Sequence, residues 1–144
     1  MILTYISASA LLDAQTAKLE QATISLDLGC TTVDVSIGRD GVLLPSGRKL
    51  DWEAVKSIQT HENGCYLITE VGELEKIQIY SEEFNRLYSL MPVAEFPAKR
   101  GLREAAPTIL ISGIPMHRIK ETTPHRDTKE KIKAAGPIKG DVLD

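Results

Sequence analysis

"ISLDLGCTTVDVSIG", residues 24–38, decides how the rest of the chain is interpreted, because apolar residues recur at every second position on both sides of a glycine. The apolar positions are Ile24, Leu26 and Leu28 before the glycine and Val33, Val35 and Ile37 after it. A period of two is typical of strands with one buried face. The stretch therefore predicts two antiparallel strands that meet at a turn formed by Gly29 and Cys30.

Further strands are expected on the C-terminal side of this hairpin. Asp40 and Gly41 form a dipeptide that favours a tight hairpin turn, so a short strand should follow at 41–45. Other alternating or apolar runs predict strands at 65–70, 74–80 and 108–112. Strands this short and this close together indicate antiparallel pairing.

Helices are predicted where apolar residues are spaced at three and four positions. We expect helices at 6–20, at 52–59 with Asp51 as its N-cap, at 81–91 between a Ser81 cap and Pro92, and at 124–135. The last helix has a Thr123-Pro124 start and a Gly136-Pro137 stop. The sequence thus predicts an α+β fold, mainly antiparallel β-sheet with two or three short helices, plus a C-terminal helical extension.

The chain has 144 residues, enough for one domain with an extension. Residues 92–107 hold three prolines, a glycine and clustered charge, which is typical of a linker. We therefore expect a β-rich N-terminal domain at 1–92, a linker at 93–107, and a third part at 108–144. That part would contain a strand, a helix and the start of another strand.

Composition excludes several protein classes. Hydrophobic residues make up 42% and charged residues 26%, as in ordinary globular domains. No apolar run is long enough to span a bilayer, and the N-terminus lacks the basic region of a signal peptide, so we expect a cytoplasmic protein without a membrane partner. Whether Cys30 and Cys65 pair is left open, with two free thiols favoured. No His or Cys has companions at ligand spacing, so we expect no metal site.

The net charge of −3 hides a division along the chain. Residues 1–96 carry 7 basic and 14 acidic side chains, whereas residues 97–140 carry 10 basic and 4 acidic ones. Arg126, Lys129 and Lys133 could form a stripe on the predicted last helix that follows an RNA backbone. No aromatic residue is interleaved to stack on bases, so a lysine-rich surface helix without a partner is the alternative.

The turn of the first hairpin, Asp27-Leu28-Gly29 with Thr31, resembles the phosphate-binding hairpin of actin-like and sugar-kinase ATPases. In those proteins the aspartate helps to hold a metal, and backbone amides approach phosphate. The second phosphate loop and the adenosine-binding segment have no counterpart in this sequence. We therefore interpret the hairpin as structural.

The C-terminal end carries a different resemblance. "PTILISGIPMHRIKETTPHRDTKEKIKAAGPIKGDVLD", residues 107–144, resembles the junction in a family of archaeal methyltransferase-like proteins of class I, which use S-adenosylmethionine. Met116-His117-Arg118 is the most specific part, and Gly140 to Asp144 resembles the entry into the first strand of the cofactor-binding sheet. Upstream, "ISLDLG", "DGVLLPSGRKLDWEAVKSI" and "FNRLYSLMPV" are also similar to that family's N-terminal domain.

The resemblance implies a non-catalytic N-terminal domain that holds substrate or mediates assembly. Met116, His117 and Arg118 would then lie near the acceptor substrate, or they would pack and hydrogen-bond locally. Asp144 would border a cofactor loop that this chain lacks, so we expect no cofactor here, although S-adenosylmethionine is expected in a full-length relative. This chain alone is expected to transfer no methyl group. The alternatives are a stand-alone binding module, for example for RNA through residues 97–139, and a homo-oligomeric assembly domain.

Overall fold

The structure is a computed structural model that describes residues 1–96, 103–137 and 140. The elements are β1 (Ile2–Thr4), α1 (Tyr5–Thr16), β2 (Gln21–Ile24), β3 (Val33–Ile37), β4 (Gly41–Leu43), β5 (Lys49–Asp51), α2 (Trp52–Gln59), β6 (Cys65–Ile68), β7 (Leu74–Lys76), β8 (Gln78–Ser81), β9 (Arg86–Ala94), β10 (Glu104–Ile111), β11 (Ile114–Pro115) and α3 (Pro124–Ala135). Every paired strand is antiparallel to its neighbour. The predicted α+β class is therefore confirmed.

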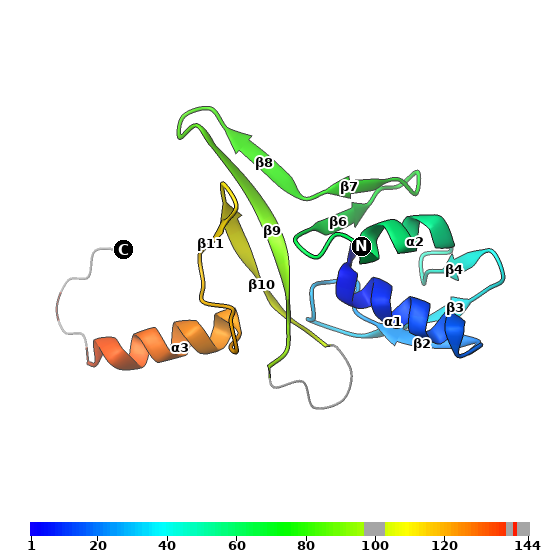
Figure 1. Cartoon of the computed structure of the whole chain (residues 1–144), viewed down its shortest axis with the longest axis horizontal. Coiled ribbons are helices and arrows are strands. Elements are labelled where there is room, and N and C mark those ends of the chain that lie inside the picture. Colours follow the sequence, from blue (N-terminus) through cyan, green and yellow to red (C-terminus); the bar gives the residue numbers. More distant parts are fainter. Residues whose placement is uncertain (97–102, 138–139, 141–144) are drawn as a thin grey trace.

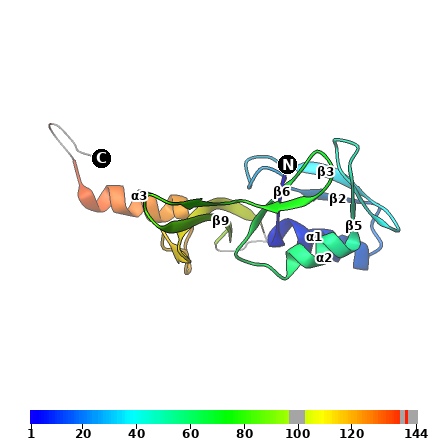
Figure 2. The same cartoon turned by 90° about the horizontal axis from the view of Figure 1, so that it is seen from above.

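The hydrophobic core lies in the N-terminal half of the chain. Two sheets, of strand order β1-β6-β7 and β2-β3-β4-β5, pack with helices α1 and α2, which lie together on one side of the strands (Figure 2). Leu3, Leu11, Val42 and Val55 are fully buried at the centre of this core. Burial of several such side chains, each favourable by roughly 1.5–3 kcal/mol, is the main stabilising contribution.

Both N-terminal helices begin at side-chain caps. The hydroxyl of Thr4 accepts a hydrogen bond from the Ser7 amide at the start of α1, and Asp51 accepts one from the Ala54 amide at the start of α2. Such caps satisfy amides that have no partner within the helix. The α2 cap was predicted, whereas strands β1 and β5, which lead directly into the helices, were not.

The first hairpin has the predicted partners but a longer connection. Strands β2 and β3 pair from Gln21–Ser36 to Ile24–Val33, and residues 25–32 form a loop between them. The prediction that strand alternation continues through Leu28 to a turn at Gly29 and Cys30 was wrong. Leu28 and Gly29 both have positive φ, +60° and +86°, which turns the chain out of the extended conformation.

The expected helix at 81–91 is absent, because these residues form the turn and strand of a β8–β9 hairpin. The expected capping bond, from the Phe84 amide to the Ser81 hydroxyl, does form at 3.4 Å. The chain then turns at Asn85, whose φ is +49°, and pairs with β8. Cross-strand contacts such as Ile79 with Tyr88 outweigh the helical spacing of the apolar residues.

The linker prediction for 93–107 is wrong at both of its ends. Val93 and Ala94 belong to β9 and pair with Ala105 and Glu104 of β10, whereas residues 97–102 lie outside the described residues. The register shifts by one residue between Ala105 and Thr108, which forms a bulge beside Pro107. A bulge accommodates a residue without an amide hydrogen, so the proline that suggested a linker lies within a sheet.

Strands β8 to β11 form a third sheet, of order β11-β10-β9-β8, and α3 extends away from it (Figure 1). Helix α3 begins at the predicted Thr123 cap, with Pro124 at its first position, and ends at Gly136. The predicted strand at the C-terminal end of the chain lies outside the described residues. No helix in the described part of the chain has the length and apolarity needed to cross a bilayer.

Candidate functional site

Met116, His117 and Arg118 follow the β10–β11 hairpin and lead toward α3. The Met116 amide donates to the Ile109 carbonyl at 2.9 Å, so the segment continues the sheet edge. The Met116 side chain is 54% exposed. The Nδ1 atom of His117 lies 3.0 Å from the hydroxyl oxygen of Thr108, which is fully buried. His117 is therefore held by the sheet, whereas Met116 remains available on the surface.

Arg118 connects this segment to α3. Its amide donates to Asp127 Oδ2 at 3.2 Å, and its guanidinium forms an ion pair with Glu130 at 2.7 Å. Asp127 is only 4% exposed and also accepts from Lys131 Nζ at 2.7 Å. The Lys131 hydrogen bond, with the Arg118 amide and both positive charges, lowers the pKa of Asp127. Local hydrogen bonding, one of the two interpretations from sequence, accounts for the Arg118 contacts.

The residues of the predicted basic stripe differ in whether they form ion pairs. Arg126 donates to Glu130 at 3.2 Å, so part of its charge is neutralised on its own helix. Lys129 and Lys133 are exposed and form no ion pair among the described residues. Asp144, named as the border of a cofactor loop, lies outside the described residues.

A second polar cluster, not predicted from sequence, surrounds Glu104 at the start of β10. Thr4 donates its hydroxyl to Glu104 Oε1, and Ser7 Oγ lies 3.5 Å from Oε2. Ser7 also donates to the carbonyl of Ser25 at 2.9 Å. The carboxylate thus joins the β9–β10 hairpin to the N-terminus of α1 and to the loop after β2.

Position and burial explain the chemistry of Glu104. Helix α1 has no acidic residue in its first turn, and the distant Glu104 supplies a negative charge where the helix dipole favours one. Burial nevertheless raises the pKa of Glu104, and hydroxyl donors such as Thr4 offset part of that effect. The same carboxylate adds to the burial that raises the pKa of Cys65 to about 12. Glu104 is thus a partly desolvated carboxylate.

The loop at 25–32 packs against this cluster. Asp27 accepts from the Thr31 amide at 2.8 Å and from the Thr31 hydroxyl at 2.6 Å, and these bonds lower the pKa of Asp27. A methyl group on Gly29 would lie 2.7 Å from the Glu104 carbonyl oxygen. The motif that resembles an ATPase hairpin therefore shapes its own loop and contacts β10.

A cavity of about 440 Å³ opens beside Glu104. Hydroxyl groups dominate its polar lining, which consists of Ser7, Thr23, Ser25, Thr32, Glu95, Arg103 and Glu104. Glu104 can accept hydrogen bonds, and Arg103 can only donate them. The cavity can therefore hold a small group that offers hydrogen-bond donors to the carboxylate side.

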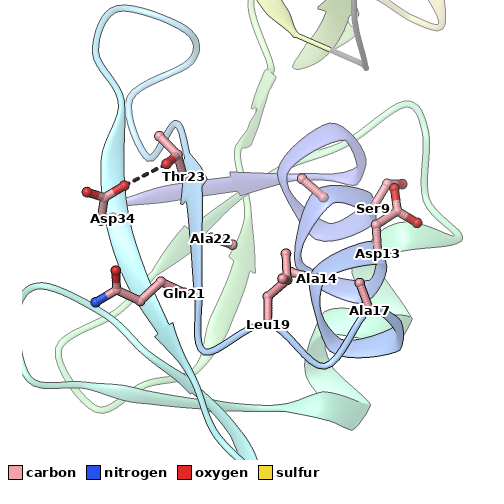
Figure 3. Close-up of a pocket in the computed structure, with 10 residues that line it drawn as sticks. Ser9, Asp13, Ala14, Ala17, Leu19, Gln21, Ala22, Thr23 and Asp34 are labelled. Carbon is pink, nitrogen blue, oxygen red and sulfur yellow. Dashed lines mark hydrogen bonds between the residues drawn. The ribbon is translucent and has the colours of Figure 1, made fainter.

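A larger groove of about 590 Å³ runs between α1 and β2 (Figure 3). Small side chains such as Ala14 and Ala17 line its helix side. Asp13 lies on α1, whereas Asp34 lies on the far strand and accepts from Thr23 at 2.6 Å. The two carboxylates do not face each other, so the groove presents no acid–base pair.

Glu104 is not recognisable as a site residue from the sequence, because its partners are remote: Thr4 and Ser7 are 100 and 97 residues away. The available signal was weak, a single carboxylate at the start of an apolar strand. No group of three potential metal ligands occurs in the described ranges. Cys30 is exposed and Cys65 is buried, and both are free thiols.

Comparison with known proteins gives one informative relative. The chain is 30% identical, over 149 aligned positions, to a protein of Methanocaldococcus jannaschii that is named "Uncharacterized protein MJ1233". The alignment covers all of this chain but 46% of the relative, so the chain spans about half the length of the curated protein it matches. No family model matches the sequence.

Proposed function

We propose that this chain is the non-catalytic, acceptor-holding part of a methyltransferase-like protein, and that the cavity beside Glu104 holds a donor-bearing group of the acceptor. The observation that carries the proposal is a partly desolvated carboxylate in the wall of a hydroxyl-lined cavity. A partly buried carboxylate gains more from a bound donor than an exposed one, because little water competes. Amines and nucleoside amino groups are suitable donors.

The non-catalytic assignment rests on the described site residues. Met116 to Arg118 connect the hairpin to α3, and their polar contacts are internal. Among the described strands, none runs through a glycine-rich loop into a helix, the arrangement that S-adenosylmethionine folds use to bind the cofactor.

The non-catalytic assignment can be tested by comparing this chain with its full-length relative. Calorimetric titration of S-adenosylmethionine should give no saturable heat with the 144-residue chain and saturable binding with the full-length Methanocaldococcus jannaschii protein. Saturable binding by the short chain would contradict the non-catalytic assignment. Absence of binding by both proteins would contradict the methyltransferase resemblance.

The cavity is tested separately. Adenosine and ethylamine, as nucleoside and amine probes, should raise the midpoint of thermal unfolding at millimolar concentration, because a ligand that binds only the folded state stabilises it. Glu104→Gln should abolish the increase, whereas Asp13→Asn, on the other groove, should leave it intact. Equal shifts in both variants would exclude the cavity as the binding place.

RNA binding through α3 is the second candidate, favoured by exposed Lys129 and Lys133, one helical turn apart. Labelled tRNA should then bind with an affinity that falls as salt rises. Replacing both lysines by glutamate should abolish the binding. The charge-matched control, Lys18→Glu with Lys56→Glu on the N-terminal helical side, should retain most of it.

A further inference from the structure

The two edges of the β11-β10-β9-β8 sheet differ in their protection. Strand β11 is two residues long and contains Pro115, which cannot donate to a neighbouring strand. Strand β8 is four residues long, contains neither proline nor charge, and exposes Ile79 (69%) and Tyr80 (55%). An uncharged apolar edge of this kind is a template for pairing with another strand.

The hydrogen-bond pattern shows which groups that edge presents. The Leu90 amide donates to the Ile77 carbonyl, and paired positions alternate between bonded and non-bonded along antiparallel strands. Gln78 and Tyr80 are opposite Ser89 and Leu87 and therefore occupy non-bonded positions. Their backbone N–H and C=O groups point away from β9, toward the outer edge.

We propose that β8 pairs with β8 of a second copy of this chain in a two-fold antiparallel arrangement with Ile79 opposite Ile79. In this register Gln78 of each copy lies opposite Tyr80 of the other, so the outward backbone groups satisfy one another. The two four-stranded sheets become one continuous sheet. This inference does not depend on the proposed acceptor site.

Charge complementarity favours a second copy as the occupant. When Ile79 of one copy lies opposite Ile79 of the other, Lys76 of each copy lies opposite Glu82 of the other. This charge pair therefore occurs at both ends of the paired β8 strands. Both side chains are exposed and lie just outside β8. Opposite charges across antiparallel strands stabilise the pair, whereas like charges destabilise it.

The apolar face of the sheet supports the same arrangement. Side chains of directly opposite residues share a face, so one face carries Ile79, Tyr88, Leu90, Ile109, Ile111 and Ile114. Ile109 and Ile114 are 39% and 72% exposed. Pairing through β8 joins this face to the same face of the second copy, with the two Ile79 side chains in contact at the centre.

Sedimentation equilibrium, from low micromolar concentration to the solubility limit, tests the proposal. The wild-type chain should be a dimer that dissociates on dilution. Ile79→Lys should raise the dissociation constant at least about tenfold, because two lysines would be opposed at the axis. Circular dichroism should show an unchanged fold, since Ile79 is exposed.

Ile114→Lys is the matched control: the residue is on the same face, is similarly exposed, and lies at the opposite edge. It should leave the dissociation constant unchanged. Dissociation by Ile114→Lys as complete as by Ile79→Lys would place the contact on the face and overturn edge pairing. A wild-type chain that is monomeric throughout would overturn it as well.

Charge reversal tests the register. Lys76→Glu alone and Glu82→Lys alone should each weaken the dimer, because each opposes like charges, and the double variant should restore the wild-type dissociation constant. Additive weakening in the double variant would overturn this register. Ile79→Cys in a Cys30→Ser background should form a disulfide-linked dimer on mild oxidation, since directly opposed non-bonded residues lie within disulfide distance.

Discussion

Gly29 lies directly against the backbone of Glu104: a methyl group built on Gly29 would lie 2.7 Å from the Glu104 carbonyl oxygen. The loop after β2 and the start of β10 are separated by most of the chain, and this contact fixes one against the other. The absence of a side chain at position 29 is therefore a tertiary requirement as well as a local one.

Gly29→Ala should destabilise the protein more than Gly72→Ala. Both glycines have a φ of +86°, so each substitution costs roughly 1–2 kcal/mol of backbone strain. No described residue lies within 4 Å of a methyl group at position 72, whereas position 29 adds a clash worth about 1–3 kcal/mol. Urea unfolding of the two variants measures the difference. Equal free energies of unfolding would show that the loop does not pack on β10 as described.

The raised pKa of Glu104 predicts how one contribution to the free energy of unfolding changes with pH. Its pKa is raised by burial, so the folded state holds the proton more tightly than the unfolded state. The contribution of this group is fully present below the ordinary glutamate pKa, about 4.3, and is lost as pH rises through the folded value.

The free energy of unfolding, measured in urea from acid to neutral pH, should therefore fall less in Glu104→Gln than in the wild type. A glutamine retains the size and accepts a hydrogen bond from Thr4. Identical pH profiles would mean that Glu104 is solvated like an exposed carboxylate.

The lowered pKa of Asp127, at the junction with α3, predicts the opposite dependence of the free energy of unfolding on pH. Its pKa is lowered by Lys131 and by the Arg118 amide, so its contribution is present above the ordinary aspartate value and is lost as pH falls through the folded value. Asp127→Asn should accelerate hydrogen exchange at the Arg118 amide by about tenfold, because local opening no longer breaks a charged contact. Asp13→Asn on α1 is the control and should leave that amide unchanged.

The two thiols should differ sharply in reactivity. Cys30 is exposed, whereas Cys65 is fully buried and its pKa is raised to about 12 by burial and by Glu104. Thiolate is the reactive form, so a disulfide reagent at neutral pH should modify Cys30 in the folded protein and Cys65 only in denaturant. Rapid native modification of Cys65 would indicate that β6 is accessible.

The sequence by itself determined the elements that depend on neighbouring residues. Helices α2 and α3 begin at the predicted caps, Asp51 and Thr123, because a capping hydrogen bond joins residues three apart. Strand β3 likewise follows from its alternation, and the β3–β4 turn falls near the predicted Asp40-Gly41, although Gly41 already begins β4. Local signals of this kind hold wherever no distant contact competes.

Only the tertiary structure decided the rest, because those contacts join remote residues. Residues 86–91 have helical spacing, yet pairing with β8 and β10 makes them a strand. Pro92 and Pro107, two of the three prolines that suggested a linker, lie in the paired strands β9 and β10, where a bulge accommodates Pro107. The Glu104 cluster needs Thr4, 100 residues away, and backbone pairing and burial at such separations leave no period in the sequence.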